Sequence, residues 1–200
     1  NLSSLNLKKN NKMACTALIH GRGLDCSRIS GGIKNIYFAV FDQITSFSYD
    51  ATNPAEIDTL NMGTNDLYKY VMPLGVSSLS DTIVGSRENG TIYYTPTCNI
   101  MLNKLTKVDQ NEIKLLGATQ TVIFAELNQQ LANGHNVIAV LGITNGMQLN
   151  AGTMDSGAAW GDKNGYTLNF DGMEQKPFSM LEDYTTDPFD NITYGTIITV

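Results

Sequence analysis

The side chains that could carry out acid–base or nucleophilic chemistry are few in this chain and lie far apart. There are two histidines, His20 in a polar N-terminal stretch and His135 beside an Asn-Gly pair. A serine or cysteine nucleophile needs such a base within hydrogen-bond reach. Neither histidine lies in a sequence pattern that would provide this contact. We therefore expect both to be structural or surface residues, and we expect no catalytic residue.

Three carboxylates toward the C-terminal end are the other candidates for chemistry: Asp155, Asp162 and Asp171. A glycosidase uses two carboxyl groups that flank one bond, and a calcium site needs several oxygens close together. These acids fall on different predicted turns, which favours solvated loop residues. Trp160 lies among them. We expect it to be a packing anchor, with a sugar-stacking platform as the alternative.

Motifs for cofactors and metals are missing from the sequence. Gly21-x-Gly23 lacks the third glycine and the following helix of a dinucleotide fingerprint, and no Walker pattern occurs. The three cysteines, Cys15, Cys26 and Cys98, form no CxxC pair, so a zinc site is not expected. Their odd number favours a reducing compartment. The sequence predicts a protein that is not an enzyme and has no cofactor and no metal.

The composition limits the possible partners. The chain carries 19 acids against 13 basic residues, a net charge of −6, and 42% of its residues are apolar. Tight nucleic-acid binding needs clustered Lys and Arg, and no such cluster is present. No run of 18 apolar residues occurs that would predict a membrane span. The apolar content is enough for a core in a domain of this size.

Four Asn-Gly pairs give the clearest structural signal, because this dipeptide supplies the positive φ angles of a tight hairpin turn. They predict an antiparallel meander in the C-terminal half, with strands at Thr121–Leu127, Asn136–Thr144, Met147–Thr153 and Tyr166–Met173.

Further strands are predicted from β-branched and aromatic runs at Ile33–Phe41, Ile44–Tyr49, Leu67–Leu74 and Thr91–Leu105, with a loop at Asp50–Asp66. Asp109 and Gly117 mark the start and end of one short helix, at about 109–117. The predicted fold class is all-β with one short helix, an antiparallel β-sandwich or small barrel. Its expected parts are an N-terminal arm (1–32), the β domain (33–182) with a long projecting hairpin loop (77–90), and a C-terminal arm (183–200).

Arms and a projecting loop that cannot pack alone expose strand edges, which proteins normally cover. We therefore expect a protein that assembles with copies of itself. The expected subunit interface is centred on the projecting segment and comprises Ser78, Leu79, Ile83, Val84, Arg87, Glu88 and Tyr93.

The order of four segments resembles the major tail tube proteins of long-tailed bacteriophages. These segments are Ser78–Leu102, Gln110–Gly117, Gln120–Leu127 and Gly161–Phe178. Met13–Phe41 is also similar to such phage structural proteins. The resemblance implies a tail-tube-type β domain that assembles into hexameric rings, stacked into a tube through which DNA is ejected.

In that setting, an acidic and amide-rich lumen would repel phosphates and let DNA slide. The implied partners are copies of the chain itself, other tail proteins with a sheath as a further candidate, and genomic DNA that passes non-specifically through the lumen. The implied location is the tail of the virion, after assembly in the host cytoplasm. The lumen candidates are Thr97, Asn99, Gln148, Asn150, Thr167, Asn169 and Asp171.

Two alternatives remain open from the sequence. One is another phage structural protein, such as a capsid decoration or head–tail connector protein. The other is a monomeric β-sandwich that binds glycans through Trp160 and the neighbouring acidic hairpins.

Overall fold

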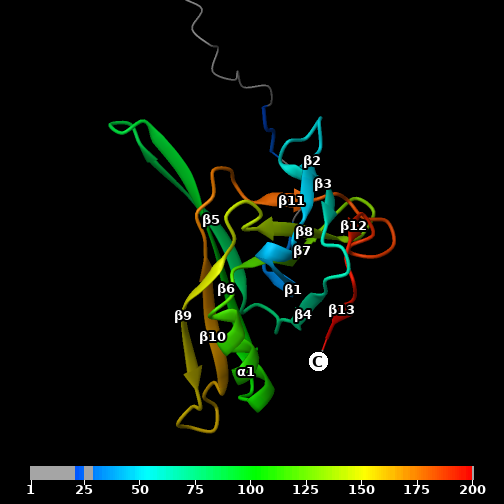
Figure 1. The fold of residues 1–200 in the computed structure, drawn as a ribbon. Coiled ribbons are helices and arrows are strands. Elements are labelled where there is room, and N and C mark those ends of the chain that lie inside the picture. Colours follow the sequence, from blue (N-terminus) through cyan, green and yellow to red (C-terminus); the bar gives the residue numbers. More distant parts are fainter. Residues whose placement is uncertain (1–20, 25–28, 200) are drawn as a thin grey trace, which may run out of the picture.

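The computed structural model describes residues 21–24 and 29–199, which form two packed β-sheets and one helix (Figure 1). His20, Cys15, Cys26 and most of the expected N-terminal arm lie outside the described residues. The strands are β1 (Ile33–Val40), β2 (Ser46–Tyr49), β3 (Glu56–Asn61), β4 (Leu67–Val71), β5 (Ser78–Ser86), β6 (Thr91–Asn103), β7 (Thr121–Gln130), β8 (Asn136–Leu141), β9 (Gln148–Asp155), β10 (Gly165–Asp171), β11 (Ser179–Leu181), β12 (Ile192–Thr193) and β13 (Ile197–Ile198).

The larger sheet, sheet A, has nine strands in the order β12-β3-β11-β8-β7-β1-β4-β13, with β2 paired to β3. The nearly continuous apolar runs of β1, β7 and β8 place these strands at the centre, where both faces of the sheet are buried. Sheet B has four strands in the order β5-β6-β10-β9, all antiparallel. Within the described residues the two sheets remain separate, which confirms the predicted sandwich in place of a closed barrel.

The main core lies between the two sheets. Alternate residues of β6 and β10 point inward, among them Cys98, Ile100, Leu168 and Phe170, and they pack against β1, β7 and β8. The ring of Phe170 lies 5.1 Å from that of Phe38 on β1. The inner face of sheet B is therefore buried in the core along β6 and β10, where these strands lie over sheet A.

Helix α1 (Lys107–Leu116) contributes to the same core through Ile113 and Leu116. Its N-cap is Thr106, whose hydroxyl oxygen accepts a hydrogen bond from the backbone N–H of Asp109 at 3.0 Å and donates one to the Asp109 carboxylate at 2.6 Å. The helix thus begins two residues before the predicted start at 109, because the capping residue is Thr106. Gly117 ends it, as predicted.

A second core covers the opposite face of sheet A. Tyr184, Phe189 and Ile192 are buried there, and β12 and β13 add parallel edge strands to sheet A. These residues belong to the segment that the sequence predicted as a C-terminal arm (183–200). In this structure they pack against their own subunit, since their aromatic and branched side chains bury the outer face of sheet A.

Two other local predictions were wrong. The segment Asp50–Asp66, predicted as a loop, contains β3, which pairs with β2, β11 and β12. The predicted meander is broken at Asn145-Gly146, because β8 lies in sheet A and β9 in sheet B. Gly146 has a φ of +77°, so the pair does form a turn, but this turn carries the chain from one sheet to the other.

Candidate assembly site: a polar sheet face and a projecting hairpin

The outer face of sheet B is mostly polar where the four strands lie side by side, with Met101 as an apolar residue opposite Thr167. Strand register aligns Ser80, Thr97, Asp171 and Gln148 in one row across the sheet. A neighbouring row contains Ser78, Asn99 and Asn169, and Thr167 follows on β10. All seven predicted lumen residues lie on β6, β9 and β10, and each of their side chains is half-buried or exposed: Thr97, Asn99, Gln148, Asn150, Thr167, Asn169 and Asp171.

Hydrogen bonds between side chains order this face. The Asn150 amide donates to the Asp171 carboxylate at 2.7 Å, and the Thr153 hydroxyl donates to Asp155 at 2.8 Å. Lys163, from the β9–β10 loop, forms an ion pair with Asp155 at 3.3 Å and also donates to the Thr167 hydroxyl. The positive charge of Lys163, at one end of the face, is therefore neutralised within the subunit.

The acids at this end are held in their ionised form. The hydrogen bonds from Thr153 and Lys163 lower the pKa of the Asp155 carboxyl. In the adjoining loop, the backbone N–H groups of Ala159 and Ala158 donate to Asp162 and lower the pKa of its carboxyl. The outer face of sheet B therefore presents hydroxyls, amides and carboxylates, with one cation that is already paired.

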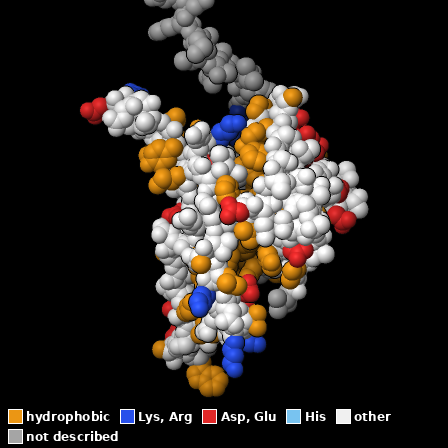
Figure 2. Space-filling model, in the orientation of Figure 1, with side chains coloured by type: hydrophobic (Ala, Val, Ile, Leu, Met, Phe, Trp, Pro, Cys, Tyr) orange, Lys and Arg blue, Asp and Glu red, His pale blue; other side chains and the backbone are white. Residues whose placement is uncertain are grey.

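The predicted projecting loop is a regular two-stranded hairpin of β5 and β6, which extends beyond the sandwich at the upper left of Figure 1. Ile83 and Ile92 near its tip are 65% and 62% exposed. The strand register places Ile83 and Ile92 on the same face of the hairpin as Leu79 and Cys98, which lie closer to the sandwich. Figure 2 shows hydrophobic side chains on this hairpin below its charged tip. The hairpin thus continues the apolar inner face of sheet B beyond the reach of sheet A.

The predicted interface residues divide into two groups in the structure. Ser78 and Leu79 lie in the sandwich, where Leu79 packs against the core. The outer part of the hairpin holds the others, Ile83, Val84, Arg87, Glu88 and Tyr93. Sequence reasoning missed Ile92 as a further exposed apolar residue, although its alternation with Tyr93 was a usable signal.

Contacts at the base of the hairpin hold it in place. Tyr94 and Glu174 exchange backbone hydrogen bonds of 2.9 and 2.8 Å. The buried Glu174 carboxylate accepts hydrogen bonds from the backbone N–H groups of Thr144 and Asn145, in the turn that crosses between the sheets. The Asp81 carboxylate accepts one from the Phe178 N–H at 2.9 Å.

The residues that could have supported other chemistry are placed apart. His135 contacts Tyr184 and the Thr185 carbonyl, Cys98 is buried in the core, and Trp160 is fully exposed in the β9–β10 loop. Trp160 as a packing anchor within the subunit is therefore wrong. The part of the chain that is described has no cluster of three or more metal-ligating side chains. It also has no helix with the length and apolar character of a membrane span.

Comparisons with known proteins give little further information. No protein-family model matches the chain, and no curated protein matches it. Among solved structures, a chain from the virion of a native gene transfer agent particle is similar, with a TM-score of 0.32 and 7% sequence identity over 56% of this chain and 88% of that chain. A TM-score of this size does not indicate a shared fold, so this similarity supports no assignment of function.

Proposed function

We propose that this protein is a structural virion protein, a major tail tube subunit whose copies assemble into stacked rings around a channel for DNA, and that it has no catalytic activity. The observation that carries the proposal is the outer face of sheet B. The inner face of β6 and β10 is buried in the subunit core where it meets sheet A, and the outer face of β6, β9 and β10 is mostly hydroxyls, amides and carboxylates, with Met101 as an apolar member opposite Thr167.

Such a face suits a channel through which duplex DNA must move. Phosphates bind to unpaired Lys and Arg side chains, and each such contact would slow the sliding of DNA. On this face the cation Lys163 is paired with Asp155, and Asp171 adds negative charge. The net charge of −6 has the same sign as DNA, so repulsion would keep the polymer away from the wall.

Self-assembly is supported by the hairpin of β5 and β6. Ile83 and Ile92 on this two-stranded projection are about two-thirds exposed, so their own subunit covers only a minor part of each side chain. Burying the remaining two-thirds of each against a neighbour would contribute roughly 1–2 kcal/mol. The partners in this proposal are copies of the chain, other tail proteins with a sheath as a further candidate, and DNA in transit. The location is the virion tail, reached after assembly in the host cytoplasm.

The first experiment is negative-stain electron microscopy of the purified chain over a concentration series. Stacked rings with a hole wide enough for duplex DNA are the expected result. Single particles at every concentration would contradict the proposal. Rings that do not stack would instead favour a connector, and particles that bind only to assembled capsids would favour a decoration protein.

A second experiment tests which face lines the channel. In a chain whose Cys15 and Cys26 are replaced by serine, Asn169→Cys should react with a bulky maleimide when subunits are dispersed and be protected in tubes. Thr52→Cys, in an exposed loop next to sheet A, is the matched control and should be protected less. Equal labelling of Asn169→Cys in both states would contradict a lumen position.

One observation favours a second candidate function, a glycan-binding module. Trp160 is fully exposed beside Asp162, and an exposed indole ring is a platform on which a sugar can stack. In that case Trp160→Ala would abolish binding to a glycan array while the protein remains monomeric. A tube subunit should show no glycan binding to lose.

A further inference from the structure

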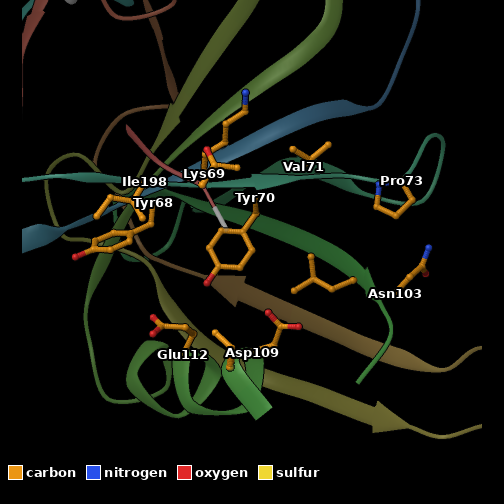
Figure 3. Close-up of a pocket in the computed structure, with 12 residues that line it drawn as sticks. Tyr68, Lys69, Tyr70, Val71, Pro73, Asn103, Asp109, Glu112 and Ile198 are labelled. Carbon is orange, nitrogen blue, oxygen red and sulfur yellow. The ribbon is translucent and has the colours of Figure 1, made fainter. Parts of the chain in front are cut away.

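A groove lies between strand β4 of sheet A and helix α1, with β13 at one side (Figure 3). Its volume is about 450 Å³. Apolar and aromatic side chains form most of its wall, and they come from four separate segments of the chain: Tyr68, Tyr70, Val71, Pro73, Leu102, Val108 and Ile198. Sequence reasoning missed this groove, because no single segment contains enough of it to produce a pattern.

Two carboxylates stand on the α1 side of the groove. Figure 3 shows Asp109 and Glu112 projecting from the helix toward the hydroxyl of Tyr70. Burial raises the pKa of Tyr70 to about 12, and the nearby charges of Glu112 and Asp109 contribute to the increase. Neither carboxylate forms an ion pair with any described residue. Lys69 also lines the groove, but its ammonium group lies over the ring of Tyr37, 5.6 Å from the ring centroid, and it forms no ion pair with either carboxylate.

Part of the apolar wall of the groove is exposed, although Tyr70 and Leu102 pack against the core. Val71 and Val108 are more than half exposed, and Tyr68 and Ile198 are exposed to a lesser degree. Hydrophobic side chains are visible in the hollow above the helix in Figure 2. A complementary occupant would bring apolar side chains for the wall and one positive charge for Asp109 and Glu112.

The tip of the projecting hairpin has this combination. Ile83, Ile92 and Tyr93 are exposed and apolar, and Arg87 at the turn is the only basic residue between Ser78 and Asn103. We propose that the groove receives the hairpin tip of a second copy of this chain, with Arg87 placed against Glu112 and Asp109. This inference rests on the proposed function and names the receiving surface for its assembly.

The arrangement of the two surfaces fits a head-to-tail contact. The hairpin tip and the groove lie at opposite ends of the molecule in Figure 1, so a subunit cannot fill its own groove. A contact between two different surfaces leaves one free hairpin and one free groove in every dimer. Repetition of the contact closes a ring or extends a fibre, which is the behaviour that a tube subunit needs.

Cysteine cross-linking between two different chains tests this contact directly. In a Cys15→Ser, Cys26→Ser background, chains with Arg87→Cys are mixed with chains carrying Glu112→Cys, and disulfides are formed under mild oxidation. A covalent heterodimer is the expected product. The matched control replaces Glu112→Cys with Lys114→Cys, which lies on the exposed side of the same helix and should cross-link far less.

Charge reversal tests the role of Arg87. Arg87→Glu and Glu112→Lys should each weaken association by about tenfold or more in sedimentation velocity. Combining both changes in one chain should restore most of the association, whereas Glu88→Gln should have little effect. Unchanged thermal unfolding of the dispersed variants would show that the subunit fold is intact.

The outcomes separate this inference from the proposed function. Two results together would overturn the hairpin-in-groove contact and leave the tube function standing. These are normal tubes formed by the Arg87→Glu variant, and no heterodimer between the Arg87→Cys and Glu112→Cys chains. Loss of assembly on deletion of residues 1–20, with no effect of Arg87→Glu, would assign assembly to the N-terminal segment and also overturn the inference. A chain that neither assembles nor cross-links would overturn both.

Discussion

Replacement of Phe189 by alanine tests whether the C-terminal segment is part of the subunit core. Phe189 is 1% exposed and packs edge-on against Tyr37 and Phe124, with ring centroids 4.7 and 5.6 Å away. Truncation of a fully buried phenylalanine typically costs about 3–5 kcal/mol, which includes the cavity left behind. For a chain of this length, we expect the melting temperature to fall by roughly 6–20 °C.

The assay is thermal and urea unfolding of dispersed subunits, with Phe47→Ala as the matched control. Phe47 is 36% exposed on the edge strand β2, so the same truncation should cost clearly less, roughly 1–2 kcal/mol. If Phe189→Ala were as mild as Phe47→Ala, the segment would behave in solution as a free arm. The second core on sheet A would then be refuted.

Three further predictions concern the helix cap, pH and the polar face. Thr106→Ala should reduce the free energy of unfolding by about 1 kcal/mol in urea titrations, because the N-cap hydrogen bond to Asp109 is lost; no change would argue against the cap. Burial raises the pKa of the Glu182 carboxyl and the Asp58 carboxylate adds to the increase, so ionised Glu182 opposes folding at neutral pH, and this opposition disappears as pH falls through the raised value. Glu182→Gln should therefore stabilise the subunit by up to about 0.5 kcal/mol at pH 7 in thermal unfolding, and the gain should vanish below about pH 4; a gain independent of pH would contradict this reasoning. Asn169→Lys should leave tubes intact but make them retain DNA in a salt-dependent way in filter-binding assays, whereas Asn169→Asp should not; equal DNA retention by both would count against a lumen position.

The sequence predicted elements well where local patterns determine them. The strands at Ile33, Thr91, Thr121 and Asn136 and the single helix were predicted close to their observed bounds. Pairing between distant segments left no such pattern. In β3 the buried residues Ile57 and Leu60 are three apart, so no alternation is visible, and the strand is stabilised by parallel partners more than a hundred residues away, β11 and β12. Asn145-Gly146 looks like the other turns, and only tertiary structure determines which sheet follows.

The candidate site was predictable to the same extent. Alternation along β6 and β10 was enough to assign the polar residues of sheet B to one face. Exposed apolar residues such as Ile83 were recognised because they lie on one continuous segment. The groove required β4, α1 and β13 to be brought together, and the exposure of Trp160 depends on how far the β9–β10 loop extends from both sheets. Neither the groove nor the exposure of Trp160 leaves a periodic pattern of apolar residues in the sequence.

The contacts of Glu174 give the hairpin a mechanical role. A pull on the hairpin tip is transmitted along β6 to the backbone bridge between Tyr94 and Glu174, and from the Glu174 carboxylate to the turn that joins the two sheets. Because β6 lies between β5 and β10, this load acts along the strands, where many hydrogen bonds must break together. In the proposed assembly, this arrangement would let the hairpin bear tension between subunits without peeling from its own sheet.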